Sequence, residues 1–147
     1  MTLALDTDVL VGWAMTGAPH HRQVRILVEG ELAARRGRVG LVPRVVEEFL
    51  HVATDKKRFP EPFTMPHALA YVEALLSAND IVVIEAGRTT LPRTLELLRT
   101  HKLGRKRILD TALAATLEAA GIRRLATFNG TDFASFDFLD VVDPRSL

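Results

Sequence analysis

Short runs of hydrophobic residues alternate along this chain with longer stretches in which hydrophobic residues recur every three or four positions. Short runs of this kind are typical of strands buried on both faces, and the longer spacing is typical of amphipathic helices. The runs predict strands at 3–6, 39–43, 81–84, 125–127 and 139–142. The longer stretches predict helices at 9–14, 22–36, 44–54, 66–78, 90–100 and 108–120, with a proline-containing loop at 56–64.

Strands that alternate with helices predict a mainly parallel sheet of four to five strands with helices on both faces, an α/β/α sandwich. A length of 147 residues and a hydrophobic content of 48% suit a single domain, 1–147, with one core. The N-terminus has no signal-peptide pattern, and no apolar run reaches the roughly 18 residues of a membrane span. We therefore expect a soluble, unprocessed protein that does not associate with a membrane.

The chain contains no cysteine, which excludes disulfides and thiolate chemistry and fits a cytoplasmic location. Any bound metal must therefore be held by oxygen or imidazole ligands. The formal net charge of +1 does not by itself indicate a nucleic-acid-binding protein. Basic residues do cluster at 35–38, 56–58 and 102–107, where they would suit a phosphate backbone, although solvated helix ends explain the clusters equally well.

Four acidic residues stand where a hydrophobic segment meets a turn or where a helix begins. They are Asp6, Glu48, Asp110 and Asp132. Ligand sites in α/β proteins form at the carboxyl ends of the strands, so the predicted fold would gather these side chains. Because like charges repel, a fold that gathers them favours a site for a divalent cation. Each acid taken alone is also explained as a helix cap, an exposed glutamate, a partner of a helix dipole or a turn residue.

The pattern around two neighbouring pairs of acids allows a choice within each pair. In the helix 44–54, the hydrophobic face leaves Glu47 nearly opposite, facing water, and Glu48 at the margin, where it can lean into a crevice. At the end of the first strand, Asp6 is the residue that the strand delivers to the site. Asp8 is expected to point elsewhere or to cap the following helix.

Taken together, four segments resemble those of the PIN-domain ribonucleases, and in particular the toxins of VapBC toxin–antitoxin pairs. The segments are Leu-Asp-Thr-Asp-Val-Leu at 5–10, Val-Pro-Arg-Val-Val-Glu-Glu-Phe-Leu at 42–50, Ile-Leu-Asp-Thr-Ala-Leu-Ala-Ala-Thr at 108–116 and Thr-Phe-Asn-Gly-Thr-Asp-Phe at 127–133. Each segment is a weak signal alone, but their order and spacing are fairly specific. Two residues depart from the commonest pattern, since Asp8 stands where asparagine is frequent and Phe128 where a basic residue often precedes Asn129.

The resemblance implies a PIN-like α/β/α sandwich that binds Mg²⁺ or Mn²⁺ and hydrolyses RNA. The metal-binding and catalytic acids would be Asp6, Glu48, Asp110 and Asp132, with Asp6 and Asp110 holding the principal cation. Residues that support the acids or hold water would be Thr7, Asp8, Thr127 and Asn129. Phosphate contacts would come from Arg105, Lys106 and Arg107. The implied partners are an RNA substrate, a cognate antitoxin and a second copy of the chain in a homodimer.

Two other functions remain open on the sequence. The opening segment also resembles that of haloacid dehalogenase-like phosphatases, in which Asp6 would be the nucleophile and Asp8 the acid/base. That chemistry needs a later lysine and a paired-aspartate loop, and no Gly-Asp or Asp-Asp pair occurs near the end of the chain. The third possibility is a non-catalytic module of the same fold that binds RNA or protein.

Overall fold

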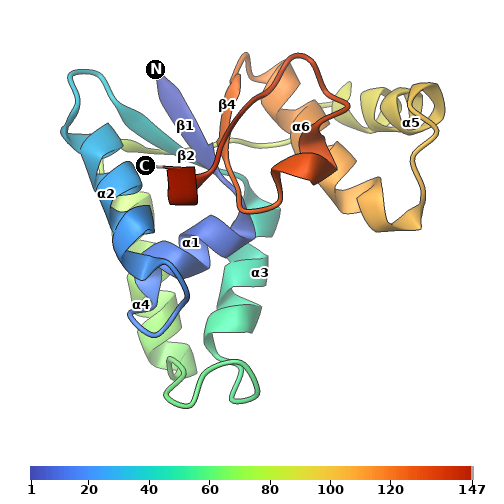
Figure 1. The fold of residues 1–147 in the computed structure, drawn as a ribbon. Coiled ribbons are helices and arrows are strands. Elements are labelled where there is room, and N and C mark those ends of the chain that lie inside the picture. The colour runs from blue at the N-terminus through green and yellow to red at the C-terminus, as the bar shows by residue number, and fades with distance from the viewer. Residues whose placement is uncertain (147) are drawn as a thin grey trace.

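A computed structural model describes residues 1–146, so Leu147, the last residue of the expected domain, lies outside the described residues. The strands form one five-stranded sheet in the order β3-β2-β1-β4-β5 (Figure 1), and every neighbouring pair is parallel. The strands are β1 (Thr2–Leu5), β2 (Arg38–Leu41), β3 (Ile81–Val83), β4 (Arg124–Ala126) and β5 (Asp140–Val142). The prediction of a parallel sheet of four to five strands is confirmed.

Helices cover both sides of this sheet, with α1 to α4 on one side and α5 and α6 on the other (Figure 1). Their bounds are α1 Thr7–Ala14, α2 His21–Ala33, α3 Pro43–Ala53, α4 Met65–Ser77, α5 Thr90–Thr100 and α6 Ile108–Ala119. Short 3-10 turns, η1 (Arg105–Arg107), η2 (Gly130–Phe133) and η3 (Pro144–Ser146), complete the described chain. The predicted sandwich is therefore present, and none of the described helices has the length and hydropathy needed to cross a membrane.

Most elements differ from the sequence prediction by one or two residues at an end, and α2 ends at Ala33 rather than at residue 36. Two of the differences have clear local causes. The first helix begins at Thr7 rather than at residue 9, because the Asp6 carboxylate accepts a hydrogen bond from the Thr7 amide and so caps the helix. The second strand ends at Leu41 rather than at residue 43, because Pro43 occupies the first turn of α3. Proline is favoured there, since its fixed φ suits a helix and it has no amide proton to leave unpaired.

The order of the strands determines where a ligand can bind. The chain places β2 and then β3 on one side of β1, and it later returns to place β4 and β5 on the other side. In open parallel sheets, a crevice forms where the strand order reverses, outside the carboxyl ends of the two strands concerned. Here those strands are β1 and β4, so the residues that follow them, Asp6 and Thr127, border the expected crevice.

Gly37 and Gly30 provide a matched test of the packing between α2 and β2. A Cβ atom at Gly37 would lie 1.8 Å from the backbone oxygen of Glu31, whereas a Cβ at Gly30, inside α2, would meet nothing within 4 Å. We expect Gly37→Ala to lower the free energy of unfolding by about 2–4 kcal/mol, because helix backbone cannot yield as a side chain can. Gly30→Ala should raise it by about 0.5–1 kcal/mol. Urea denaturation of both variants measures these changes, and equal stability of the two would contradict the packing described.

Candidate active site

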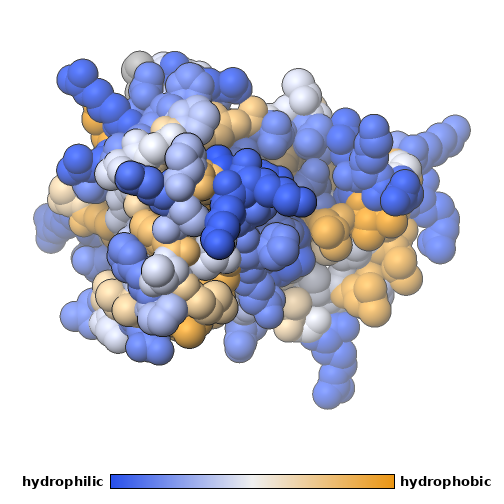
Figure 2. All heavy atoms as spheres, turned by 90° about the horizontal axis from the view of Figure 1, so that it is seen from below, coloured by the Kyte–Doolittle hydropathy of each residue, from blue (hydrophilic) through white to orange (hydrophobic). Residues whose placement is uncertain are grey.

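A pocket of about 1020 Å³ lies at the crevice between the carboxyl ends of β1 and β4. Its lining includes four acidic residues, Asp6, Asp8, Glu48 and Asp110. Figure 2 shows the molecule from the side toward which β1 runs, where hydrophilic residues predominate and hydrophobic residues form separate patches. The structure therefore brings together three of the four acids expected at the site, and Asp8 as well.

Asp6 joins the two central strands through its side chain. One carboxylate oxygen accepts the amide proton of Thr7 at 2.8 Å, and the other accepts the hydroxyl proton of Thr127 at 2.8 Å. Thr127 follows β4 and is fully buried, and its hydroxyl also accepts a hydrogen bond from the Asn129 amide at 3.1 Å. Both threonines therefore hold the Asp6 carboxylate in place at the end of β1.

Glu48 reaches the pocket from α3, and Glu47 is exposed to solvent, as the helical pattern predicted. The Thr7 hydroxyl donates to Glu48 at 2.9 Å, so Thr7 links Asp6 to Glu48 through its amide and its hydroxyl. Arg44, one turn before Glu48, forms an ion pair with its carboxylate and donates to the backbone oxygen of Leu109 at 3.2 Å. Arg44 thereby connects α3 to the beginning of α6.

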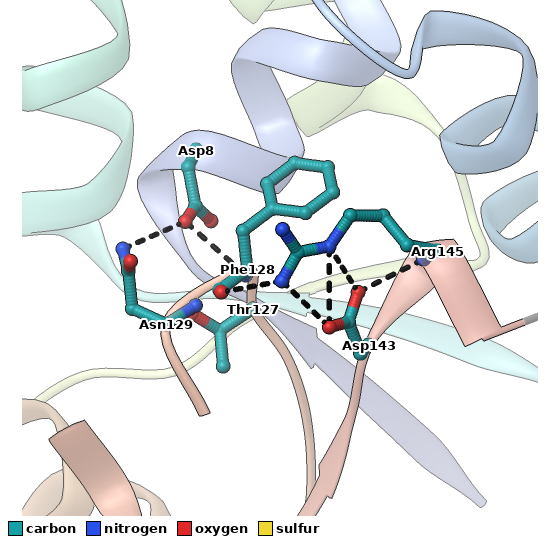
Figure 3. Close-up of polar contacts among 6 residues, drawn as sticks. All are labelled: Asp8, Thr127, Phe128, Asn129, Asp143 and Arg145. Carbon is teal, nitrogen blue, oxygen red and sulfur yellow. Dashed lines mark hydrogen bonds and ion pairs between the residues drawn. The ribbon is translucent and has the colours of Figure 1, made fainter. Parts of the chain in front are cut away.

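Asp8 lies in the first turn of α1, and the expectation that it would point elsewhere or cap the helix was wrong. Asp6 is the cap, and Asp8 lines the pocket. One Asp8 oxygen accepts from the Phe128 amide at 3.2 Å and from the Asn129 side-chain amide at 3.1 Å (Figure 3). The other, Oδ1, is buried and has no hydrogen-bond partner among the described residues. A buried carboxylate oxygen without a donor is costly, which indicates a place for a cation or a proton.

The remaining two acids belong to the segments around α6. Asp110 lies in the first turn of α6 and is partly buried at the pocket wall. Asp132 lies in η2 and does not line the pocket, but its charge acts on Asp110. Asp132 forms an ion pair with Arg107 at 2.8 Å. The structure therefore places Asp132 at the margin of the acidic cluster.

Burial and mutual repulsion make these acids hard to ionise together. Burial raises the pKa of Asp6, although the hydrogen bonds from Thr127 and Thr7 oppose the shift. Burial and the neighbouring charge of Asp6 raise the pKa of Asp8 to about 7. Burial, followed by the charges of Asp6 and Asp132, raises the pKa of Asp110 to about 6. Perturbed acids that share a crevice are characteristic of functional sites.

The chemistry of these acids suits a hard divalent cation, although their side chains are not spaced as in a formed metal site. Among residues 1–146, no three histidine or acidic side chains are close enough together to hold a metal ion as they stand. The donors are nevertheless all carboxylate oxygens, one of them buried and unpaired, and these are the ligands that Mg²⁺ and Mn²⁺ prefer. Glu48 and Asp132 form ion pairs with Arg44 and Arg107, so a cation would compete with these two arginines.

The basic residues at the pocket differ from those expected for phosphate contact. Arg105 and Lys106 are exposed outside the pocket lining, and Arg107 is engaged with Asp132. The pocket is instead lined by His20, Arg58 and Arg145. Arg58 lies within the basic cluster 56–58, so its composition gave a signal, but Arg145 stands alone near the end of the chain. The packing of η3 against α2 and the hydrogen bonds of Arg145 to Asp143 and to the Phe128 backbone bring Arg145 to the site.

Comparison with known proteins agrees with this geometry. The PIN domain family matches residues 3–139. Ribonuclease VapC33 of Mycobacterium tuberculosis is 32% identical over 141 residues, which cover 95% of each chain.

Two solved structures share the fold, namely M. tuberculosis VapC20, a sarcin–ricin loop cleaving toxin, and a toxin–antitoxin complex from Klebsiella pneumoniae. The first has a TM-score of 0.68 at 18% identity, covering 91% of this chain and 95% of VapC20. The second has a TM-score of 0.65 at 19% identity, covering 97% of both chains. With this sequence match and an acidic pocket at the reversal of its sheet, the chain belongs to the PIN domain family and is similar over nearly its whole length to a VapC ribonuclease.

Proposed function

We propose that this protein is a divalent-metal-dependent endoribonuclease that acts in the cytoplasm as the toxin of a toxin–antitoxin pair. The observation that carries the proposal is the cluster of Asp6, Asp8 and Asp110, whose pKa values are all raised and one of whose oxygens is buried without a partner. The family membership and the similarity to a VapC ribonuclease support it. A cation of the Mg²⁺ or Mn²⁺ type would relieve the repulsion among these carboxylates.

In this proposal Asp6 and Asp110 hold the principal cation and Asp8 adds its unpaired oxygen. Glu48 and Asp132 act through water or complete a second site, since each is already bound to an arginine. When bound, the cation lowers the pKa of a water molecule and offsets negative charge that builds on the phosphate during hydrolysis. Thr7 and Thr127 keep the Asp6 carboxylate oriented, and Asn129 orients Asp8. Among residues 1–146, the pocket lining includes no serine, cysteine or lysine that could act as a nucleophile.

The phosphatase alternative does not fit this pocket. An aspartyl-phosphate mechanism needs a lysine near the nucleophile, and the described residues lining the pocket include none. The family match also covers residues 3–139 as a PIN domain. A non-catalytic module would have no need for carboxylates with raised pKa values in one crevice, so catalysis is the simpler account.

The proposed partners are an RNA substrate, a cognate antitoxin and a second copy of the chain. VapC20 cleaves the sarcin–ricin loop, and the K. pneumoniae structure is a toxin–antitoxin complex, which supports the first two. Exposed leucines on α5 and α6 support the third, because Leu91, Leu95 and Leu109 are each more than half exposed, at 67%, 51% and 55%. Exposed apolar side chains on a pair of packed helices are typical of a protein interface.

Removing either principal carboxylate should abolish RNA cleavage. We expect Asp6→Asn and Asp110→Asn each to lower the rate by at least about 10²–10³-fold, because the cation loses a charged ligand. The measurement is cleavage of total cellular RNA with Mg²⁺ or Mn²⁺, followed by mapping of the new ends, and chelation should stop cleavage by the wild type. Asp140→Asn is the matched control, since Asp140 is an exposed acid at the opposite end of the sheet. Cleavage that survives both site substitutions would refute the proposed mechanism.

The charge on Asp8 should make the metal-free protein less stable as the pH rises. The folded protein holds the Asp8 proton up to a pKa of about 7, whereas the unfolded chain loses it near 3.8, so folding becomes less favourable between these pH values. Asp8→Asn should match the wild type near pH 4 and exceed its stability by roughly 1–3 kcal/mol above pH 7. Thermal unfolding in a chelator across this range measures the difference between the two proteins.

Added Mn²⁺ should reverse the order of stability of the wild type and Asp8→Asn. A cation competes with protons for the same oxygens, so the Mn²⁺-induced rise in melting temperature should grow from about pH 5.5 to about pH 7.5 in the wild type. The rise should be smaller in Asp8→Asn and in Asp6→Asn. A cation response that does not depend on pH or on these residues would mean that Mn²⁺ binds elsewhere.

A further inference from the structure

One wall of the pocket is built from residues that the proposed metal chemistry does not use. His20 and Phe128 form an aromatic pair whose ring centroids lie 5.6 Å apart. The guanidinium carbon of Arg145 lies 5.3 Å from the centroid of the Phe128 ring. All three residues line the pocket together with the acids, and they come from the α1–α2 loop, the loop after β4 and the η3 turn.

Arg145 is held firmly in this position (Figure 3). Its Nε and Nη2 donate to the Asp143 carboxylate, with Nη2 at 2.8 Å, and Nη2 also donates to the backbone oxygen of Phe128 at 3.0 Å. Within residues 1–146, Nη1 has no hydrogen-bond partner. A fixed guanidinium with one free nitrogen, 47% exposed on its side chain, is ready to bind an anion such as a phosphate.

The backbone at His20 adopts an uncommon conformation. Its φ of +60° lies in the left-handed region, which non-glycine residues seldom adopt. His20 is exposed, and its side chain makes no capping hydrogen bond to α2. An exposed imidazole, a partly buried phenyl ring and a guanidinium are the groups on which unpaired RNA bases stack.

We propose that His20, Phe128 and Arg145 form a subsite for one unpaired nucleotide next to the acidic cluster, with the base against the aromatic pair and the phosphate on Nη1 of Arg145. Phe128 occupies the position before Asn129 at which a basic residue is frequent in the family that the sequence resembles. Arg145 returns a positive charge to that position from the end of the chain, and its distance from the phenyl ring is within the range of a cation–π contact. The subsite thus replaces a simple basic contact by a combined stacking and phosphate contact.

This inference rests on the proposed action on RNA, but its test does not require cleavage. The probe is a set of four fluorescein-labelled homopolymeric decamers with 2′-O-methyl ribose, bound to the protein in EDTA at pH 8 and followed by fluorescence anisotropy. His20→Asn removes the ring and keeps a residue type that tolerates the left-handed region. Phe128→Leu keeps an apolar side chain and removes the aromatic face.

The three substitutions should weaken binding in two distinguishable ways. His20→Asn and Phe128→Leu should each raise the Kd by about 5- to 100-fold without changing its dependence on salt, because stacking releases no counterions. Arg145→Gln should raise the Kd and also reduce the slope of log K against log salt by about 0.7, as expected for one lost phosphate contact to a single strand. Arg145→Lys should restore the slope but only part of the affinity, since it lacks the planar group.

Arg123→Gln is the matched control, because Arg123 is an exposed arginine paired with Asp140 at the opposite end of the sheet. It should leave the Kd within twofold, and a retained Mn²⁺-induced rise in melting temperature should show that each variant is folded.

If RNA is cleaved but His20→Asn and Phe128→Leu bind as the wild type does, the subsite is wrong and the proposed function stands. If the wild type cleaves no RNA but the variants lose binding as described, the subsite stands and the catalytic proposal fails. Equal losses in Arg123→Gln and Arg145→Gln would also overturn the subsite, since general charge would then explain them.

Discussion

The repulsion among carboxylates at the junction of β1 and β4 is the constraint on which the rest of this structure depends. A parallel sheet whose strand order reverses at this junction must bring the ends of both strands to one crevice. The sequence puts Asp6 and Asp8 just after β1, and α6 brings Asp110 to the same crevice. Burial of these groups together costs free energy that the fold must offset by other contacts.

The surrounding residues offset this charge unequally. The outer acids, Glu48 and Asp132, are each paired with an arginine, so the protein neutralises them from within. Of the central acids, Asp6 and Asp8 receive hydrogen bonds from hydroxyl and amide groups. Within residues 1–146, Asp6, Asp8 and Asp110 form no ion pair with an arginine, and the pKa values of all three are raised. An unequal distribution of this kind leaves a place where an external cation gains most by binding, which is the physical basis of the proposed catalysis.

The sequence predicted those parts of the molecule that depend on local patterns. Hydrophobic periodicity located the strands and helices, and the helical spacing separated exposed Glu47 from Glu48, which lines the pocket. It failed where contacts between distant segments decide the outcome. The direction of Asp8 depends on a loop 120 residues away, and the place of Arg145 depends on how the last turn packs against α2. The hydrophobic periodicity within either segment does not carry this information, because the positions of Asp8 and Arg145 are fixed only when the distant segments pack together.

The hydrogen bond between Thr127 and Asp6 joins residues that are 121 positions apart in the chain. During synthesis, β1 emerges from the ribosome long before β4 exists, and pairing of such distant segments is intrinsically slow. Until β4 docks, Asp6 lacks its threonine and Asp8 lacks the loop that holds it, so the nascent polypeptide has no assembled crevice. The crevice is therefore complete only after β4 and the loop that follows it have been translated and have packed against β1.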